Sequence, residues 1–252
     1  SGGDAPGMNA AIRSVVRTAI HHNLRVLAIH GGYEGMIDRN FFEMDTSSVG
    51  NIIHRGGTVI KTSRSDRFKI KKWRTIAYKN LKKSGIDGVI LIGGNGSIAG
   101  ANLFTSEFDL PFMVIPKTID NDIYGTDFSI GFDTATNTAL EAIDKIRDTA
   151  NSHHRLFFIE VMGRDMGFIA LHCGVSAGAE FILVPENKNN MSELIERFER
   201  GWRKNKSSII VVVAEGAVKG GVNVIAQQIA MKFKHYEIRV SVLGHIQRGG
   251  NP

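Results

Sequence analysis

Five short segments of the sequence combine glycines with charged or hydroxyl-bearing side chains. They are Ser1–Gly7, Ile92–Ser97, Pro116–Asp122, Glu160–Arg164 and Gly244–Gly250. Glycines ahead of a helix let backbone N–H groups approach an anion closely, and an arginine fork bonds two phosphate oxygens at once. Two carboxylates beside a lysine suit a general base and a metal ligand. Together, the segments favour transfer of a phosphoryl group to a phosphorylated substrate over hydride transfer.

Each segment alone also has a simpler interpretation. Ile92–Ser97 is a glycine-rich turn that matches neither the Walker loop nor the GxGxxG fingerprint. Pro116–Asp122 is also compatible with a solvated acidic turn, and either arginine with a surface salt bridge. His245 by itself is more typical of a packed or exposed histidine than of a catalyst. The prediction therefore depends on the joint pattern.

Apolar runs of strand length alternate with segments of helical periodicity. The predicted strands are Val26–His30, Gly88–Ile92, Phe112–Ile115, Leu156–Met162, Phe181–Val184, Ile209–Ala214 and Val240–Leu243. The predicted helices are Asn9–Ile20, Ala135–Ile146, Ile169–Val175 and Ser192–Trp202. This alternation predicts an α/β fold with mainly parallel sheets covered by helices. Because no linker-like stretch divides the chain, a second domain would be interleaved with the first.

The composition excludes several classes of protein. A chain of 252 residues with 42% hydrophobic residues can bury a sizeable core, which excludes a disordered chain. The single cysteine, Cys173, excludes a disulfide scaffold. The longest apolar runs fall short of the ~20 residues that span a bilayer. The net charge of +6 suits a small anionic substrate, whereas the lack of long basic runs argues against nucleic acid. With no secretory signal visible, the sequence predicts a cytoplasmic enzyme.

Six motifs in order along the chain closely resemble those of the phosphofructokinase family. They are Ser1–Arg13 (SGGDAPGMNAAIR), Gly93–Ser97, Thr118–Asp122 (TIDND), Gly131–Ala135, Glu160–Arg164 (EVMGR) and Gly244–Gly250 (GHIQRGG). The resemblance covers essentially the whole chain and implies two interleaved α/β domains. These are a donor-binding domain over about 1–130 and a sugar-phosphate domain over 131–243, with 244–252 opening a further segment. Family members run further at both ends, so the resemblance implies a fragment without the first strand and the C-terminal segment.

The resemblance implies Mg²⁺-dependent transfer of a phosphoryl group to the 1-hydroxyl of fructose 6-phosphate, a step of glycolysis. It implies Asp120 as the catalytic base, aided by Thr118, with Arg164 stabilising the transferred group. The implied metal ligands are Asn95 and Asp122. The implied donor-binding residues are Gly3, Arg64, Gly94, Asn95, Gly96 and Ser97. The implied sugar-phosphate residues are Thr118, Asp120, Arg155, Met162, Gly163, Arg164, Glu215, Arg239, His245 and Arg248.

Two positions leave the phosphoryl donor and the rate open. Asn95 stands where the family has Asp, which removes a charge from the metal site. Gly96 is typical of ATP-dependent members, whereas Lys117 is usual in pyrophosphate-dependent members and occurs in some that use ATP. We therefore predict ATP as the donor and keep pyrophosphate as the alternative. A catalytically weakened regulatory subunit is a second alternative, supported by Asn95 alone.

The resemblance also implies a homo-oligomer, usually a tetramer, in which Arg155 and Arg239 reach the sugar-phosphate site of a neighbouring subunit. It implies allosteric control as well, although Thr46 stands where the family's effector site has an arginine. The residues that resemble this effector site are Arg13, Arg17, Arg147, Lys204 and Lys206.

Overall fold

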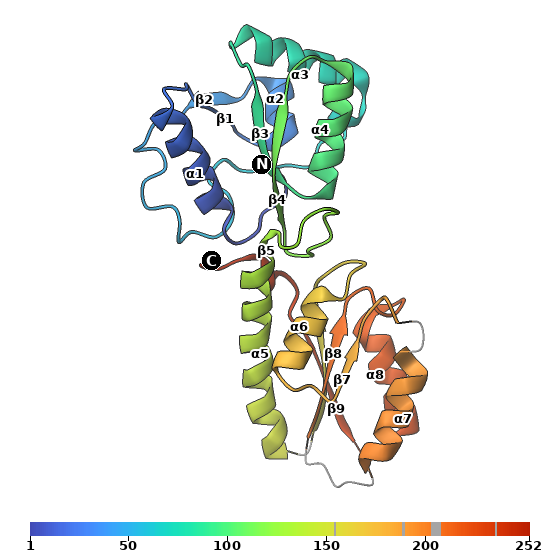
Figure 1. Cartoon of the computed structure of the whole chain (residues 1–252). Helices are drawn as coiled ribbons and strands as arrows, with labels where there is room; N and C mark the ends of the chain where they lie inside the picture. Colours follow the sequence, from blue (N-terminus) through green and yellow to red (C-terminus); the bar gives the residue numbers. More distant parts are fainter. Residues whose placement is uncertain (154, 188–189, 203–207, 235) are drawn as a thin grey trace. The chain divides into compact units, whose positions relative to one another are not determined.

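The computed structural model of the chain describes residues 1–153, 155–187, 190–202, 208–234 and 236–252. These residues form two compact units (Figure 1). Unit 1 comprises Ser1–Thr118, Asp122–Gly131 and Arg248–Pro252, and unit 2 comprises Ile119–Asn121 and Phe132–Gln247. The two units are thus interleaved along the sequence, as the α/β fold class predicted.

Unit 1 contains a small antiparallel sheet and a parallel one. Its elements are α1 (Met8–His21), β1 (Leu27–Ile29), α2 (Gly32–Asp38), β2 (Phe41–Glu43), η1 (Arg67–Lys69), α3 (Lys71–Lys83), β3 (Val89–Gly93), α4 (Asn95–Glu107), β4 (Phe112–Thr118) and β5 (Ile130–Gly131). Strands β1 and β2 pair antiparallel, and β3, β4 and β5 form the parallel sheet in that order. The register pairs Gly93 with Pro116, so β3 and β4 deliver the loops that follow them to the same sheet edge.

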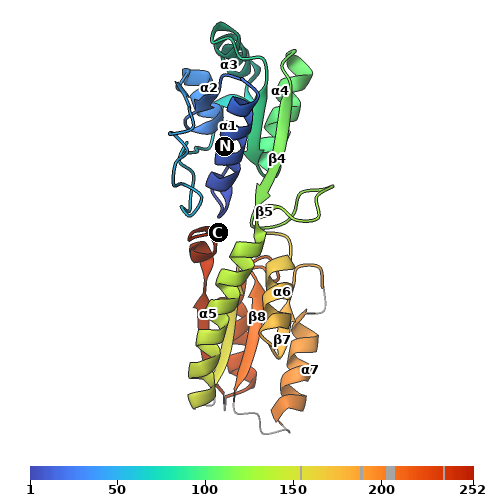
Figure 2. The same ribbon diagram turned by 60° about the vertical axis from the view of Figure 1, so that its left-hand side comes forward.

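Unit 2 is a four-stranded parallel sheet with helices on both faces. Its elements are α5 (Phe132–His153), β6 (Arg155–Val161), α6 (Phe168–Ser176), β7 (Phe181–Leu183), α7 (Asn190–Trp202), β8 (Ile209–Ala214), α8 (Gly221–Lys232), β9 (Glu237–Val242) and η2 (Gly244–Arg248), whose last residue belongs to unit 1. The strand order is β7-β8-β6-β9. Figure 2 shows α5 running along this sheet.

Alternation along the central strands divides the core of unit 2 into two layers. Phe158 and Val211 point to one face, where they pack with Phe198 of α7 and Ile225 of α8. Helices α5 and α6 contact β6 and β8 on the other face. Every residue of β8 is buried, as a strand covered on both faces requires.

All seven predicted strands are present, and the four predicted helices are confirmed, with ends that coincide with the prediction or extend beyond it by up to seven residues. Two short strands, β2 and β5, carried too few apolar residues to be predicted. Helix α3 was missed because its sequence is rich in lysine and buries little besides Ala77 and Leu81. Helix α4 begins at Asn95, directly after Gly94, which has the extended backbone of an N-cap. None of the described helices is both long and apolar enough to cross a membrane.

A buried ion pair joins α3 to α4. Arg74 donates from Nε and Nη2 to the two carboxylate oxygens of Glu107, at 2.8 and 2.7 Å, and from Nη1 to the carbonyl of Phe68. The side chains are only 5% and 13% exposed. Because a buried charge without its partner is strongly unfavourable, each member depends on the other.

Replacing Glu107 with Gln keeps the shape of the side chain and leaves the Arg74 guanidinium without its counter-ion. We expect Glu107→Gln to lower the free energy of unfolding by about 3 kcal/mol, as for other buried pairs that lose one partner. The matched control is Glu43→Gln, which breaks an exposed pair with Arg25 and should change stability by less than about 1 kcal/mol. Urea unfolding at neutral pH measures both, and equal losses would contradict the prediction.

The pH dependence of the same pair has a defined sign. The hydrogen bonds from Arg74 hold the pKa of Glu107 below its ordinary value of 4.5. The stabilisation is therefore fully present above that value and is lost as the pH falls through the lowered pKa. The difference in stability between the parent and Glu107→Gln should accordingly shrink in acid.

Candidate active site

Two glycine loops of unit 1 pack against each other at the carboxyl end of β3. The N–H of Gly2 donates to the carbonyl of Ile92 at 2.8 Å. A Cβ on Gly93 would come within 2.6 Å of the Cβ of Ser97, and one on Gly2 would meet the Ser97 hydroxyl. Only glycine permits this approach, so the loop Ser1–Gly7 and the first turn of α4 lie together.

The end of β4 joins the same cluster of loops. The ammonium of Lys117, a buried residue, donates to the carbonyl of Gly3. A Cβ on Gly94 would lie 3.3 Å from the carbonyl oxygen of Lys117. The carbonyl of Thr118 accepts a hydrogen bond from the Ser129 hydroxyl at 2.7 Å. The structure thus brings together Gly3, Gly94, Ser97 and Thr118, four of the residues implied for catalysis and donor binding.

Gly96 lies in the first turn of α4, where open space surrounds it. No atom lies within 4 Å of a Cβ built on this residue, and its backbone is not left-handed. The first N–H groups of a helix have no partner within the helix, and its N-terminus favours negative charge. The position can therefore take an anion, and it can also take a larger residue without strain.

Tyr33, which the sequence analysis missed, supports this turn from outside. Its hydroxyl donates to the carbonyl of Ser97, and its ring stacks on Phe68 with centroids 3.9 Å apart. The ring also lies against Gly100, where a Cβ would come within 2.8 Å of it. Burial raises the pKa of the Tyr33 hydroxyl, which therefore stays protonated as a donor. A tyrosine with no chemical motif around it offered no signal in the sequence.

Asn95 and Asp122, the implied metal ligands, are neighbours in unit 1. The side-chain nitrogen of Asn95 donates to the backbone carbonyl of Asp122 at 3.2 Å. One carboxylate and one amide oxygen are hard ligands of the kind Mg²⁺ accepts when most of its other ligands are water and substrate phosphates. No cluster of three or more acidic, histidine or cysteine side chains with metal-binding geometry occurs among the described residues. The pair therefore fits a metal that is carried mainly by the donor.

Arg248 and Arg64 occupy different environments in unit 1. The guanidinium of Arg248 donates to the carboxylate of Asp4 at 2.8 Å and to the carbonyl of the same residue at 3.1 Å. It therefore holds the loop Ser1–Gly7 in place. Arg64 is exposed in the segment that precedes η1. Their implied roles toward substrates stay predictions.

In unit 2, Asp120 and Arg164 form an ion pair. Nε of Arg164 lies 3.3 Å from Oδ2 of Asp120, whose side chain is only 8% exposed, whereas that of Arg164 is 71% exposed. Arg164 and Asn121 both have left-handed backbones, with φ of 52°. Such conformations are uncommon outside glycine and cluster at functional sites. The pair thus combines a buried carboxylate with a cation that reaches solvent.

Side chains from the segments that follow β8 and β9 hold the loop that carries Arg164. Oε1 of Glu215 accepts the N–H groups of Gly163 and Arg164 at 3.2 and 2.7 Å. Oε1 of Gln247 accepts the N–H of Met162 at 3.3 Å. Gly163 has φ of 145° and leaves no space for a Cβ, which would lie 2.5 Å from the carbonyl of Met166. The three N–H groups are therefore bound by protein side chains, and the side chain of Arg164 is the part of this loop that can reach a ligand.

Among the remaining sugar-phosphate candidates, Arg155 begins the inner strand β6, Arg239 lies on the edge strand β9, and His245 lies beyond β9. Arg155 on β6 and Arg239 on β9 both pair with Glu237, the former at 3.1 Å. The hydrogen bond from Arg155 lowers the pKa of Glu237. His245 is exposed in η2. Arg155 and Arg239 are thus brought together, and His245 is left accessible.

The implied effector residues divide between the units. Arg13 belongs to unit 1, where it donates to the carbonyl of Val49 at 2.5 Å, and Arg17 belongs to the same unit. Arg147 belongs to unit 2, where it donates to the carbonyl of Ala177 at 2.6 Å. Lys204 and Lys206 lie outside the described residues.

Sequence reasoning also missed Asn9 and Gln247, two fully buried polar side chains inside the glycine motifs. Asn9 donates to the carbonyl of Arg55 at 2.7 Å and accepts the N–H of Val59 at 2.8 Å, which ties α1 to the segment between β2 and η1. The sequence offered one signal for such residues, which is a polar side chain at a position where the hydrophobic pattern predicts burial. Neither residue has a side chain that performs acid–base chemistry, so a search for catalytic types passes over both.

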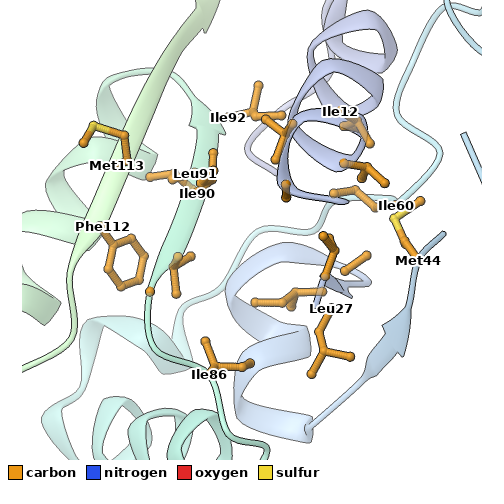
Figure 3. Close-up of a pocket in the computed structure, with 18 of the residues that line it drawn as sticks. Ile12, Leu27, Met44, Ile60, Ile86, Ile90, Leu91, Ile92, Phe112 and Met113 are labelled. Atoms are coloured by element: carbon orange, nitrogen blue, oxygen red, sulfur yellow. The ribbon is translucent and has the colours of Figure 1, made fainter. Parts of the chain in front are cut away.

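An apolar cavity of about 520 Å³ lies in unit 1, and Ser1, Tyr33 and Ile92 beside the glycine loops belong to its lining. Figure 3 shows its lining, which includes Ile12 of α1, Leu27 of β1, Leu91 of β3 and Met113 of β4. Arg25 and Asp87 are the charged side chains in the lining, and none of the implied catalytic or binding residues contributes to it. The cavity therefore borders the glycine loops, although the implied phosphoryl-transfer residues do not line it.

Comparison with known proteins decides the family. The family model described as Phosphofructokinase matches residues 1–252. The chain belongs to the phosphofructokinase family. It is 51% identical over 252 residues to a Bacteroides thetaiotaomicron protein named ATP-dependent 6-phosphofructokinase 2, and 53% identical over 254 residues to ATP-dependent 6-phosphofructokinase 1 of Thermus thermophilus. All of this chain aligns with each, over 77% and 78% of their lengths.

Solved phosphofructokinases share the fold. The chain matches the Saccharomyces cerevisiae phosphofructokinase with a TM-score of 0.92 and 33% identity, over 99% of this chain and 37% of that one. It matches a pyrophosphate-dependent phosphofructokinase of Marinobacter aquaeolei with a TM-score of 0.82 and 25% identity, over 98% of this chain and 67% of the other. The α/β class and the family inferred from the motifs are therefore confirmed.

The pairing of Asn95 with Asp122 yields a prediction about metal affinity. Asn95→Asp should tighten Mg²⁺ binding roughly threefold to tenfold, because Mg²⁺ prefers charged oxygen ligands. It should lower the melting temperature without metal, since a second carboxylate then lies near Asp122. Calorimetric titration with Mg²⁺ in the presence of a non-hydrolysable nucleotide measures the first effect, and a thermal melt measures the second. Equal or weaker Mg²⁺ affinity in Asn95→Asp would show that asparagine does not weaken the site.

Proposed function

We propose that this phosphofructokinase transfers the terminal phosphoryl group of ATP to the 1-hydroxyl of fructose 6-phosphate, giving fructose 1,6-bisphosphate in glycolysis. Relatives at 51–53% identity over the whole chain are named ATP-dependent 6-phosphofructokinases. The observation in the structure that carries the proposal is the Asp120–Arg164 pair, which sets a buried carboxylate against a solvent-reaching guanidinium. These are the two groups that the reaction needs at the attacking oxygen and at the transferred phosphoryl group.

Asp120 acts as the general base in this proposal. Its carboxylate takes the proton of the sugar hydroxyl as that oxygen attacks the phosphorus, and the hydroxyl of Thr118 assists in orienting it. Arg164 keeps Asp120 in place through Nε and can use its terminal nitrogens on the transferred group. Positioning and charge stabilisation, rather than covalent chemistry by the protein, supply most of the catalysis in phosphoryl transfer.

The donor side of the proposal rests on unit 1. The open space at Gly96 leaves room for a nucleotide, and the ammonium of Lys117 is bound to the carbonyl of Gly3. The open space at Gly96 is the observation that favours ATP over pyrophosphate. Mg²⁺ held by Asn95 and Asp122 would supply positive charge to the donor oxygens.

The acceptor side rests on the arginines and the loops that carry them. Arg155, Arg239, His245 and Arg248 supply the charge for a sugar phosphate, and Glu215 keeps the Met162–Arg164 loop in shape. The proposal includes a cytoplasmic homo-oligomer, in which Arg155 and Arg239 serve the site of a neighbouring subunit, and allosteric control.

Asp120→Asn should lower kcat by roughly 10²–10⁴-fold, because the proton acceptor is lost. Binding of fructose 6-phosphate, measured by calorimetry, should persist within about threefold. The matched control is Asp165→Asn, the same chemical change in an exposed residue next to Arg164, which should retain parental turnover. Turnover of Asp120→Asn within threefold of the parent would remove Asp120 from the role of base.

Gly96→Asp should reduce turnover with ATP far more than with pyrophosphate. The added carboxylate would enter the space beside the nucleotide's phosphates, and the fold accommodates it because nothing lies within 4 Å. Gly96→Ala separates volume from charge and should have a smaller effect. Steady-state assays with each donor decide, and equal losses for both donors would contradict ATP selection at this position.

A further inference from the structure

Gln247 is a fully buried carboxamide that is not among the residues implied for catalysis or for donor, sugar-phosphate or metal binding. It lies in η2 and links two loops of unit 2. Its Oε1 accepts the N–H of Met162 at 3.3 Å, and its Nε2 donates to the carbonyl of Gly244 at 2.9 Å. A carboxamide presents one donor and one acceptor side, as a backbone peptide group does.

This carboxamide lies where the pairing between β6 and β9 ends. The ladder runs to Glu160 and Val242, followed by a hydrogen bond from the N–H of Leu243 to the carbonyl of Glu160 at 3.0 Å. Beyond that point the two strands lead into separate loops. The N–H of Met162, just past the end of β6, is bound by the side chain of Gln247 instead of by a backbone carbonyl of a neighbouring strand. Glu215, which follows β8, binds the next N–H of the same loop.

The position of Arg164 depends on this support. Its backbone is left-handed and its Nε lies 3.3 Å from Asp120, so a small rotation of the loop would move the guanidinium away from the carboxylate. Burying a carboxamide is unfavourable unless both its ends are hydrogen-bonded, whereas methionine of similar length would fill the same space without that requirement. Packing alone therefore does not explain glutamine here.

We propose that Gln247 is a positioning residue for phosphoryl transfer. Its carboxamide sets the spacing between the Met162–Arg164 loop and the turn that carries His245, and so places the groups that face the sugar phosphate. This inference rests on the proposed function for its effect on turnover, but the geometry of the Met162 amide can be tested without any assay of activity.

Gln247→Glu separates positioning from packing through pH. The substitution keeps the shape, and burial beside the carbonyl of Gly244 raises the pKa of the new carboxyl. When ionised it cannot donate to that carbonyl; when protonated it can. We expect the KM for fructose 6-phosphate to be raised about tenfold at pH 8, with kcat also lowered, since misplacement of about 1 Å is costly to catalysis. Both parameters should return to within threefold of the parent at pH 6, and the KM for ATP should stay unchanged throughout.

Gln247→Met and Gln228→Glu are the controls. The methionine variant has no donor at any pH, so its defect should not recover at pH 6. Gln228 is exposed on α8, and its substitution should leave every parameter unchanged. The proposal would be overturned if Gln247→Glu and Gln247→Met both kept the parental KM and kcat at both pH values and differed from the parent only by a lower melting temperature. Gln247 would then be a packing residue.

Hydrogen exchange at the Met162 amide gives a readout that is independent of activity. We expect exchange at least tenfold faster in Gln247→Met than in the parent, with Val161 unaffected. Unchanged protection of Met162 would overturn the proposal even if turnover falls. If the parent lacks phosphofructokinase activity while Met162 is deprotected in the variant, the proposed function fails and the structural link made by Gln247 stands.

Discussion

The backbone N–H groups that follow β6 need hydrogen-bond acceptors, and the arrangement of unit 2's candidate site depends on how these are supplied. Within the parallel sheet each N–H is paired with a neighbouring strand, but beyond the sheet edge only side chains or a ligand can accept it. Glu215, directly after β8, and Gln247, in η2 after β9, provide the acceptors. The loop can therefore keep Arg164 in a left-handed backbone and present its guanidinium to Asp120.

The corresponding constraint in unit 1 is close approach of backbone to backbone. Gly2 and Gly93 allow the loop Ser1–Gly7 to lie against the first turn of α4, and the ammonium of Lys117 and the guanidinium of Arg248 hold that loop from two sides. The protein thus uses its own cations to hold the loop, and leaves the helix N-terminus around Gly96 open. An anion that enters meets backbone N–H groups and space rather than a side chain.

Two residues of unit 1, Asn95 and Lys117, act on charge in the same direction. Asn95 removes a carboxylate from the neighbourhood of Asp122, and Lys117 adds a buried cation to the same unit. Each change makes this unit less repulsive to a polyphosphate. The amide keeps an oxygen that can face a cation, so the loss of charge at Asn95 is compatible with a metal that arrives bound to the donor.

The sequence by itself determined the fold class, the seven main strands, the family and the residue types capable of phosphoryl transfer, because buried strands and glycine motifs leave local patterns. It did not reveal that Tyr33 supports α4, that Gln247 continues the β6–β9 ladder or that Asp4 holds Arg248. Each of these contacts joins residues that are distant along the chain and carries no periodic signal. Only the tertiary structure decided them, since a side-chain hydrogen bond depends on which two loops the strands bring to the same sheet edge.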